Sequence, residues 1–251
     1  MIRYAAMHSE PEVLTGEPMW SRNLLAIYET DADIVASVLP QPLEVAEPWV
    51  RANFAQVDMP DGPLSAGTVA VRCSCDGVIG SYDLLMIMST EAAVLGGRET
   101  FGEPKKLGTA SIKRNGAGVV ATMSRKGVDL VEVRGRAVEQ LTPGPIDERF
   151  AFYFKFLMDP AGDRFDGDPS LVRVRRTQED RVRERIEGEV ILRDSPFDPL
   201  AELPVRQIIS ITYTESQQTQ TGEILRTVPP EWVWPFRHQR YDGMIARLQP
   251  T

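Results

Sequence analysis

The sequence predicts a mainly β protein (α+β class), built from a single antiparallel sheet that curves into a cone or barrel and carries a few short helices. Apolar or alternating segments recur along almost the whole chain, and turn signals such as Asp76-Gly77 and Asn115-Gly116 separate them. Few segments have helical spacing. Because so many strands must bury their apolar faces with few helices to cover them, the sheet is expected to curve or close.

The bulk properties fit one soluble globular domain. The chain has 251 residues, which is enough for one large β domain or two smaller ones, and we expect a single domain over residues 1–251. Its net charge of −8 argues against nucleic acid as a partner. It shows no long apolar run and no signal-peptide pattern, so we expect no membrane partner and a cytoplasmic location.

The first elements are expected near the N-terminus. Residues 1–19 are polar and interrupted by proline and glycine, which indicates an arm that packs on a neighbour. Residues 23–28 predict the first strand. A short helix should follow, with Thr30 as its N-cap, Asp33 as a capping carboxylate and Pro40 as its stop.

The remaining strands follow from alternation and from apolar runs between turns. The expected strands are residues 51–58, 67–75, 81–89, 110–114, 118–123, 128–141, 152–157, 171–176, 182–193 and 207–215. Beyond them, residues 226–251 form an aromatic-rich extension. The arginine-rich stretch over residues 173–187 is interleaved with acidic residues, which indicates a solvated strand pair with many ion pairs.

Cysteine and histidine give no sign of a metal or of a disulfide. Cys73 and Cys75 stand two residues apart, so a strand would place both on one face, where neighbours are poorly oriented for a disulfide. We expect buried, inert thiols. His8 and His238 lie outside any cluster with metal-ligand spacing. We therefore expect no catalytic metal and no cofactor.

The feature that carries chemistry is a pair of adjacent lysines. The chain has five lysines among its 28 lysine and arginine residues, and two of them, Lys105 and Lys106, follow Pro104 directly. A lysine can lose its proton when it is buried and then attack a carbonyl to form a Schiff base, whereas arginine stays charged. The pair therefore predicts a nucleophilic amine, although a solvated turn is the alternative.

Neutralising a lysine requires more than one nearby charge. Half-neutralisation at pH 7 costs about 4.6 kcal/mol for an ordinary lysine. A second ammonium about 6 Å away contributes roughly 2.8 kcal/mol at an effective dielectric constant of about 20. Desolvation in an apolar pocket must supply the rest. Because Pro104 favours extended backbone, Lys105 and Lys106 should point to opposite faces, one into a cavity and the other toward a partner outside it.

The residues around the pair resemble a known family. Gly-Gly-Arg-Glu at 96–99 and Gly-Glu-Pro-Lys-Lys-Leu-Gly at 102–108 closely resemble the lysine motif of the acetoacetate decarboxylase family. Further matches lie, in order, at residues 22–31, 39–51, 77–82 and 203–210, so the resemblance covers roughly residues 20 to 225. It implies a sheet-built cone around the lysine, a small oxo-acid substrate and a homo-oligomer of four or more subunits.

The resemblance also implies roles for single residues. Lys105 becomes the Schiff-base lysine, with Lys106 beside it. Arg22 aligns with the arginine that the family's decarboxylases are thought to use near the substrate carboxylate, and Arg98 is either a second such arginine or a structural anchor. Glu103 is either a general acid or base or the ion-pair partner of the lysine. Tyr82 and Asn53 complete the candidate substrate-binding residues.

Two departures from the family pattern change the expected reaction. The decarboxylases have glutamates where this chain has Asn53 and, by the simplest spacing, Ala66, which puts acetoacetate decarboxylation in doubt. The extension supplies Tyr241 as a proton donor at the cavity rim, and Trp232 and Trp234 as an aromatic arm for a neighbouring subunit. These features resemble the aldolase-dehydratase branch, which condenses pyruvate with an aldehyde. An acetoacetate decarboxylase and a non-catalytic ligand-binding β-barrel remain the alternatives.

Overall fold

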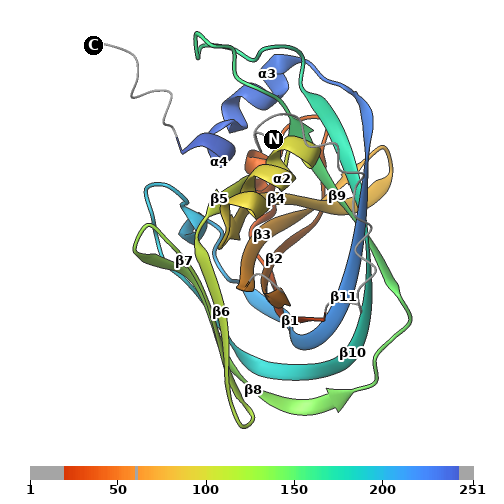
Figure 1. The fold of residues 1–251 in the computed structure, drawn as a ribbon, viewed down its shortest axis with the longest axis vertical. Coiled ribbons are helices and arrows are strands. Elements are labelled where there is room, and N and C mark those ends of the chain that lie inside the picture. The colour runs from red at the N-terminus through yellow and green to blue at the C-terminus, as the bar shows by residue number, and fades with distance from the viewer. Residues whose placement is uncertain (1–19, 60–61, 243–251) are drawn as a thin grey trace, which may run out of the picture.

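The structure is a computed structural model that describes residues 20–59 and 62–242. The predicted N-terminal arm, residues 1–19, lies outside the described residues. Within the described part, eleven strands form one sheet, which confirms the mainly β class (Figure 1). No helix in residues 20–59 or 62–242 is long and apolar enough to cross a membrane.

The strands and helices are as follows. The strands are β1 (Ser21–Glu29), β2 (Glu44–Met59), β3 (Gly62–Cys75), β4 (Val78–Met88), β5 (Lys105–Leu107), β6 (Thr109–Asn115), β7 (Gly118–Arg125), β8 (Val128–Leu141), β9 (Asp147–Lys155), β10 (Ser170–Leu192) and β11 (Gln207–Thr227). The helices are α1 (Ala32–Val38), α2 (Glu91–Phe101), α3 (Pro230–Val233) and α4 (His238–Tyr241), with short 3₁₀ turns η1 (Leu200–Glu202) and η2 (Trp234–Phe236).

Part of the sheet closes into a ring. β11 pairs with both β10 and β1, so β1, β2, β3, β4, β9, β10 and β11 form a closed circuit. β10 is long enough to pair with two strands along the same edge: residues 170–178 pair with β9, and residues 183–192 pair with β8. Strands β8, β7 and β6 leave the ring there as a wing; Figure 1 shows β6 and β7 to the left of β1–β4, β8 below them, and β10 and β11 to the right.

Alternation along the ring strands separates an apolar core from a polar cavity. On β2, Ala52 and Phe54 are buried in the main core, while the alternating residues Arg51 and Asn53 face the interior of the ring. The wing packs on the core side, and its Met123 approaches Gly67 of β3 so closely that a Cβ there would collide with it. The core thus lies between β1–β4 and the wing.

Several local predictions hold, and some need correction. The strand over residues 128–141 has the predicted bounds, and Gly116 turns the β6–β7 hairpin with φ 58°. The strands expected over 171–176 and 182–193 are instead one strand, interrupted by an irregularity next to Asp180. The N-cap of α1 is Asp31 rather than Thr30, and Asp31 makes no side-chain capping bond.

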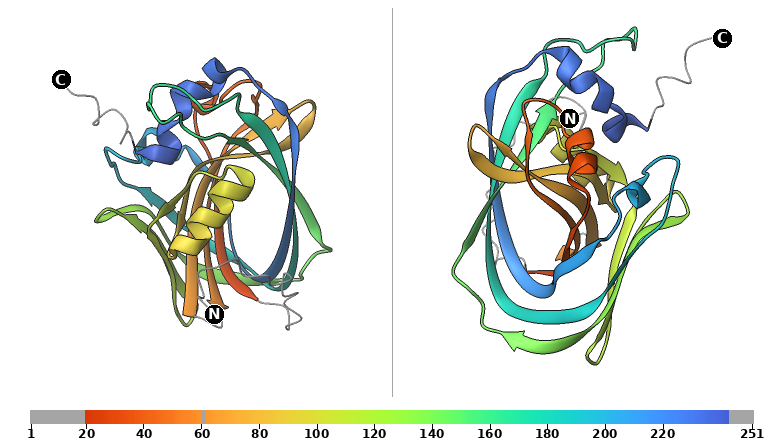
Figure 2. Two further views of the ribbon diagram at one scale, coloured as in Figure 1. Left: turned by 45° about the horizontal axis from the view of Figure 1, so that its top comes forward. Right: turned by 180° about the vertical axis from the view of Figure 1, so that it is seen from behind.

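Helix α2 is the element that the sequence pattern did not reveal. It begins after Thr90, whose side chain accepts a hydrogen bond from the Ala93 amide, and ends at Gly102, which adopts φ 79°. Gly96 and Gly97 in its interior disfavour a helix by about 1 kcal/mol each relative to alanine. The helix contacts β4, β5 and β9, and Figure 2 shows it lying across one end of the ring.

The aromatic extension packs on its own chain. Trp232 and Trp234 lie half-buried against the main core, and the Trp234 ring meets the Phe165 ring edge-on at 5.1 Å. α3, η2 and α4 fold back over the end of the ring, and a contact of the two tryptophans with a neighbouring subunit stays a prediction. Residues 243–251 of the extension lie outside the described residues. Cys73 and Cys75 are free and buried, as predicted.

Candidate active site

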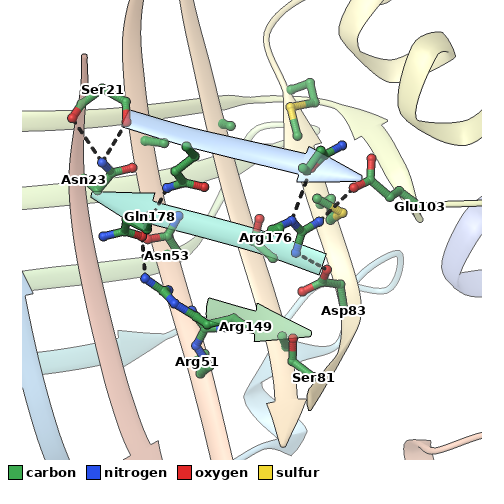
Figure 3. A pocket seen from close by; sticks show the side chains of 18 of the residues that line it. Ser21, Asn23, Arg51, Asn53, Ser81, Asp83, Glu103, Arg149, Arg176 and Gln178 are labelled. Atoms are coloured by element: carbon green, nitrogen blue, oxygen red, sulfur yellow. Dashed lines mark hydrogen bonds and ion pairs between the residues drawn. The ribbon is translucent and has the colours of Figure 1, made fainter. Parts of the chain in front are cut away.

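A cavity of about 450 Å³ lies inside the ring. That size is typical of a small-molecule site. Its floor comes from the inward-facing residues of β2, β3 and β4, and β10 and β11 cross over it (Figure 3). Its polar lining consists of Ser21, Asn23, Arg51, Asn53, Thr68, Ser81, Asp83, Glu103, Lys105, Arg149, Arg176, Gln178, Gln218 and Gln220.

Lys105 projects into this cavity beside Glu103. The Lys105 Nζ atom lies 2.8 Å from Oε2 of Glu103, and the two side chains are 13% and 1% exposed. Among the described residues, Lys105 is the sole partner of that Oε2 atom. Pro104 keeps the backbone extended, so Glu103 and Lys105 share one face. The amine is therefore enclosed, and a carboxylate stands next to it as a base.

Gly97 of α2 makes room for the pair. A Cβ at Gly97 would lie 2.5 Å from Lys105 Nζ and closer still to Glu103 Oε2. Real Cβ atoms do not approach other atoms so closely, so only glycine is compatible with this arrangement. At the neighbouring Gly96, an added Cβ would meet nothing within 4 Å. Gly97 thus weakens the helix but leaves the space that the Lys105 and Glu103 side chains occupy.

Arg176 of β10 fixes Glu103 from the other side. Its Nη2 donates to Glu103 Oε1 at 2.8 Å and to the Tyr153 hydroxyl at 2.7 Å. The Tyr153 hydroxyl also contacts Asp83, which lines the cavity. Burial raises the pKa of the Asp83 carboxyl and of the Tyr153 phenol. The result is a connected network in which Glu103 is held between two cations.

Lys106 points to the opposite face of β5, away from the cavity. Its Nζ lies 2.9 Å from Asp198 and 2.8 Å from Asp242, and the lysine side chain is 5% exposed. Arg125 contacts both aspartates as well. Because these carboxylates neutralise Lys106, its charge cannot supply the repulsion that the sequence argument assigned to a neighbouring ammonium. Instead of a neighbouring positive charge, Lys105 has the Glu103 carboxylate beside it, in a largely buried position.

Comparison with known proteins decides the family. The sequence model described as "Acetoacetate decarboxylase (ADC)" matches residues 4–228, which is most of the chain. The chain belongs to the acetoacetate decarboxylase family. It is 28% identical over 199 residues to the acetoacetate decarboxylase of Chromobacterium violaceum, covering 74% of this chain and 78% of that one. With the acetoacetate decarboxylase of Paraburkholderia phytofirmans it shares 39% identity over 88 residues, and this match spans only 34% of either chain.

Solved structures of other proteins share the fold of this chain. The acetoacetate decarboxylase of Legionella pneumophila superposes with a TM-score of 0.73 at 20% identity, over 89% of this chain and 94% of that one. The enduracididine biosynthesis enzyme MppR, complexed with pyruvate, gives a TM-score of 0.70 at 16% identity, over 86% and 93% of the two chains. MppR is also known in complex with the condensation product of pyruvate and imidazole 4-carboxaldehyde.

Arg22 lies outside the cavity. Its neighbours Ser21 and Asn23 face the cavity, so the alternation of β1 turns Arg22 to the other side, where it pairs with Asp58 at 3.1 Å. The side chain is 46% exposed. The resemblance had placed it near the substrate carboxylate, whereas in this structure its side chain points away from the cavity.

Tyr82, Arg98 and Tyr241 also lie away from Lys105. Tyr82 donates a hydrogen bond to Gln239 at 2.6 Å, behind the cavity wall. The guanidinium of Arg98 lies over the Tyr241 ring, 5.1 Å from its centroid. These side chains join the C-terminal helices to the end of the ring, so the structure gives them a packing role and does not bring Tyr241 to the cavity rim.

Asn53 and Ala66 do face the cavity. Strand pairing places Asn53 opposite Thr68, Thr68 opposite Met86, and Met86 opposite Lys105, so Asn53 belongs to the same cross-strand row as the lysine. Ala66 lies one step along β3 and lines the same wall. Both positions that the resemblance assigns to glutamates in decarboxylases thus present an amide and a methyl group to the cavity.

Three cavity arginines and Asp83 were missed by the sequence argument. Arg176 lies in the stretch that was interpreted as a solvated strand pair, which is correct for Arg173, paired on the surface with Glu223. The signal that could have found Arg176 is the alternation that begins with the buried Val172 and Val174 and continues inward through Arg176 and Gln178.

The described residues offer acidic and basic groups for catalysis, and no obvious metal ligands. Within residues 20–59 and 62–242, no group of three or more His, Cys, Asp or Glu side chains is placed to hold a metal ion. In this part of the chain, the charged lining of the cavity consists of one amine, two carboxyls and three guanidinium groups.

Proposed function

We propose that this chain is a Schiff-base-forming lyase that acts on a small oxo acid through Lys105. The observation that supports it is the enclosed Lys105–Glu103 pair, with Nζ 2.8 Å from Oε2. Glu103 takes a proton from the ammonium, and the neutral amine attacks the ketone carbon of the oxo acid. Loss of water then gives a protonated imine, which accepts electrons from the bond that breaks next.

Arg176 suits the role of holding the substrate carboxylate. Its Nη2 is occupied by Glu103 and Tyr153, whereas the contact of its Nη1 with Asp83 is long, at 3.9 Å. A carboxylate on the carbon next to the imine would lie close to this Nη1 atom, because Glu103 bridges Arg176 and Lys105. The same contact would leave Glu103 oriented toward the imine.

The finer proposal is a pyruvate aldolase-dehydratase. Glu103 removes a proton from the methyl group of the pyruvate imine, and the resulting enamine forms a carbon–carbon bond to the aldehyde carbon, whose oxygen takes up a proton. Elimination of water from the adduct and hydrolysis of the imine release a conjugated oxo acid and free Lys105. Asn53 and Ala66 support this reading, because neither supplies the carboxylates expected of a decarboxylase. The complex of the structural relative MppR with the condensation product of pyruvate and imidazole 4-carboxaldehyde supports it as well.

Acetoacetate decarboxylation is the second candidate, favoured by the curated relatives that align over about three quarters of the chain. The same imine, formed with acetoacetate, would take up the electron pair released as carbon dioxide leaves.

The homo-oligomeric state, a tetramer or larger, stays a prediction. Sedimentation velocity would test it by measuring the mass of the assembly in solution.

Borohydride trapping tests the proposal. The wild-type protein is incubated with pyruvate or, separately, with acetoacetate, reduced, and analysed by mass spectrometry of the intact chain and of its peptides. We expect one pyruvate adduct on the peptide that contains Lys105, none in Lys105→Arg, and an unchanged adduct in the control Lys113→Arg, whose lysine is exposed on β6. No adduct with either acid would overturn the lyase and favour a ligand-binding barrel.

Two product assays separate the reactions. Pyruvate with a panel of aldehydes should give the absorbance of a conjugated enone, and acetoacetate should give no carbon dioxide above the uncatalysed rate. Carbon dioxide release that depends on Lys105, without enone formation, would replace the aldolase-dehydratase by the decarboxylase.

A further inference from the structure

The cavity carries more positive than negative charge. Its two carboxyls, Glu103 and Asp83, both face Arg176, and Glu103 also faces Lys105. Two further guanidinium groups, those of Arg51 and Arg149, line the same cavity. The cavity lining therefore contains four cations and two carboxyls. This excess of two positive charges is available for ligands to neutralise. The carboxylate of a single monoanionic oxo acid would neutralise one of them.

Arg51 is the cation without a protein partner. Within residues 20–59 and 62–242 it makes no ion pair and no side-chain hydrogen bond, and it is half-buried with its guanidinium facing the cavity. Burial first, and then the charge of Arg149, lower the pKa of Arg51 to about 10, so the group is still charged at neutral pH. A partly desolvated guanidinium with open donors favours an anionic ligand.

Arg149 reinforces the charge at the same end of the cavity. It lies directly opposite Arg176 across the β9–β10 pair, where like charges repel. Its Nε donates to Asp147 at 2.6 Å, and Asp147 is 58% exposed at the rim, so the compensation is weak. Figure 3 shows Arg51 beside Arg149 and apart from Glu103, with Arg176, the strand partner of Arg149, connecting the two groups. The two arginines thus form a cationic pair of their own.

Two strands of the sheet separate Arg51 from the strand that carries the amine. Arg51 is on β2, and Lys105 is on β5, with β3 and β4 between them in the sheet. Three strand spacings amount to about 14 Å along the sheet. A carboxylate on the imine-bearing molecule, one bond from the imine carbon, would remain near Lys105 and Arg176. The Arg51–Arg149 pair therefore faces a part of the cavity that pyruvate leaves free.

We infer that Arg51 and Arg149 form a carboxylate subsite for the second substrate, so that the preferred acceptor is an aldehyde with a carboxylate at its far end. This inference rests on the proposed function, because it assigns the acceptor of the same enamine. The aldehyde carbon faces the enamine, and the remote carboxylate accepts hydrogen bonds from the two guanidinium groups. The cavity of about 450 Å³ accommodates both molecules.

The test compares two acceptors of the same shape that differ in charge. Wild-type protein is assayed with pyruvate and either 4-oxobutanoate or 4-methylpentanal, in which an isopropyl group replaces the carboxylate. We expect kcat/KM for 4-oxobutanoate to exceed that for 4-methylpentanal by at least about tenfold. Arg51→Met should remove this preference by raising KM for 4-oxobutanoate, and Arg51→Lys should retain part of it.

The controls separate the subsite from the lyase. Arg22→Met removes an arginine that points away from the cavity and should keep the full preference. The pyruvate adduct on Lys105 should form in Arg51→Met as in wild type, which also shows that the variant is folded. Equal kcat/KM for the two aldehydes, or an unchanged ratio in Arg51→Met, overturns the subsite alone. Absence of the pyruvate adduct in wild type overturns the lyase and the subsite together.

Discussion

The two faces of β5 place adjacent lysines in opposite kinds of surroundings. On the outer face, the buried cations Lys106 and Arg125 balance Asp198 and Asp242, and the more exposed Lys126 approaches Asp242 at 3.7 Å. On the inner face, Lys105 shares Glu103 with Arg176 and opens onto a cavity with surplus positive charge. The buried charges of the outer cluster compensate one another, whereas the surplus positive charge of the cavity favours binding of an anionic ligand. The comparison indicates that one lysine holds the fold and the other performs chemistry.

The largest expected difference in activity comes from replacing each lysine in turn by arginine, which removes the amine and keeps the positive charge. Lys105→Arg should abolish turnover, by more than about a thousandfold, because arginine cannot form the imine. Lys106→Arg should lose less than about tenfold, because a guanidinium can still pair with Asp198 and Asp242. Steady-state rates with pyruvate and an aldehyde measure both. Comparable losses in the two variants would contradict the division of roles.

Adding one methyl group on the inner side tests how tightly the catalytic pair is held. Gly97→Ala should lower kcat by about a hundredfold or more, because its Cβ would displace Lys105 and Glu103 from their present positions. Gly96→Ala is the matched control on the same helix, with open space around its Cβ, and should keep full activity and gain slightly in stability. Circular dichroism checks that both variants fold, and full activity in Gly97→Ala would refute the proposed packing.

Breaking the outer cluster should show up in stability. Lys106→Met leaves Asp198 and Asp242 buried with one cation fewer, and should lower the free energy of unfolding by about 3–5 kcal/mol. Arg22→Met, which breaks an exposed pair, should change it by less than about 1 kcal/mol. Denaturant titration gives both values. If the two variants were equally stable, the outer cluster would have no structural role.

The smallest expected effect is a pH dependence from Asp242. Burial acts to raise the pKa of its carboxyl, but hydrogen bonds from Arg125 and Lys106 outweigh it and lower the pKa. Such a group contributes stability that is full above its unfolded pKa of about 3.9 and is lost as the pH falls through the lower folded value. Wild type should therefore lose more stability than Asp242→Asn on acidification below about pH 4, measured by thermal unfolding. Parallel curves would exclude this coupling.

The strands could be predicted from the sequence because alternation and turn signals are local. The bounds of β8 and the glycine turn of the β6–β7 hairpin needed no knowledge of distant residues. The ring itself depends on β11 pairing with both β1 and β10, over separations that no local pattern encodes. A curved sheet could thus be predicted, and its closure could not be drawn strand by strand.

The site was harder to predict, and the failures have physical causes. Helix α2 was missed because Gly97 contradicts helix propensity in order to accommodate Lys105 and Glu103. Arg22 was assigned from the resemblance, but the alternation of β1 turns it away from the cavity, where it pairs with Asp58. Arg51 lies in the stretch 39–51 that resembles the family, but its lack of an ion-pair partner among the described residues becomes visible only in the folded structure. Residues that act together at the site come from six or more separate segments.

The short parallel pairing of β5 gives the outer aspartates one more consequence. β5 has three residues and pairs with Met86, Ile87 and Met88 alone, so little in the sheet itself prevents a slip by one position. Such a slip would exchange the two amines and leave Glu103 facing an empty place. Asp198 and Asp242 pair only with the second lysine of the doublet, so they favour the register in which Lys105 faces the cavity as the proposed nucleophile.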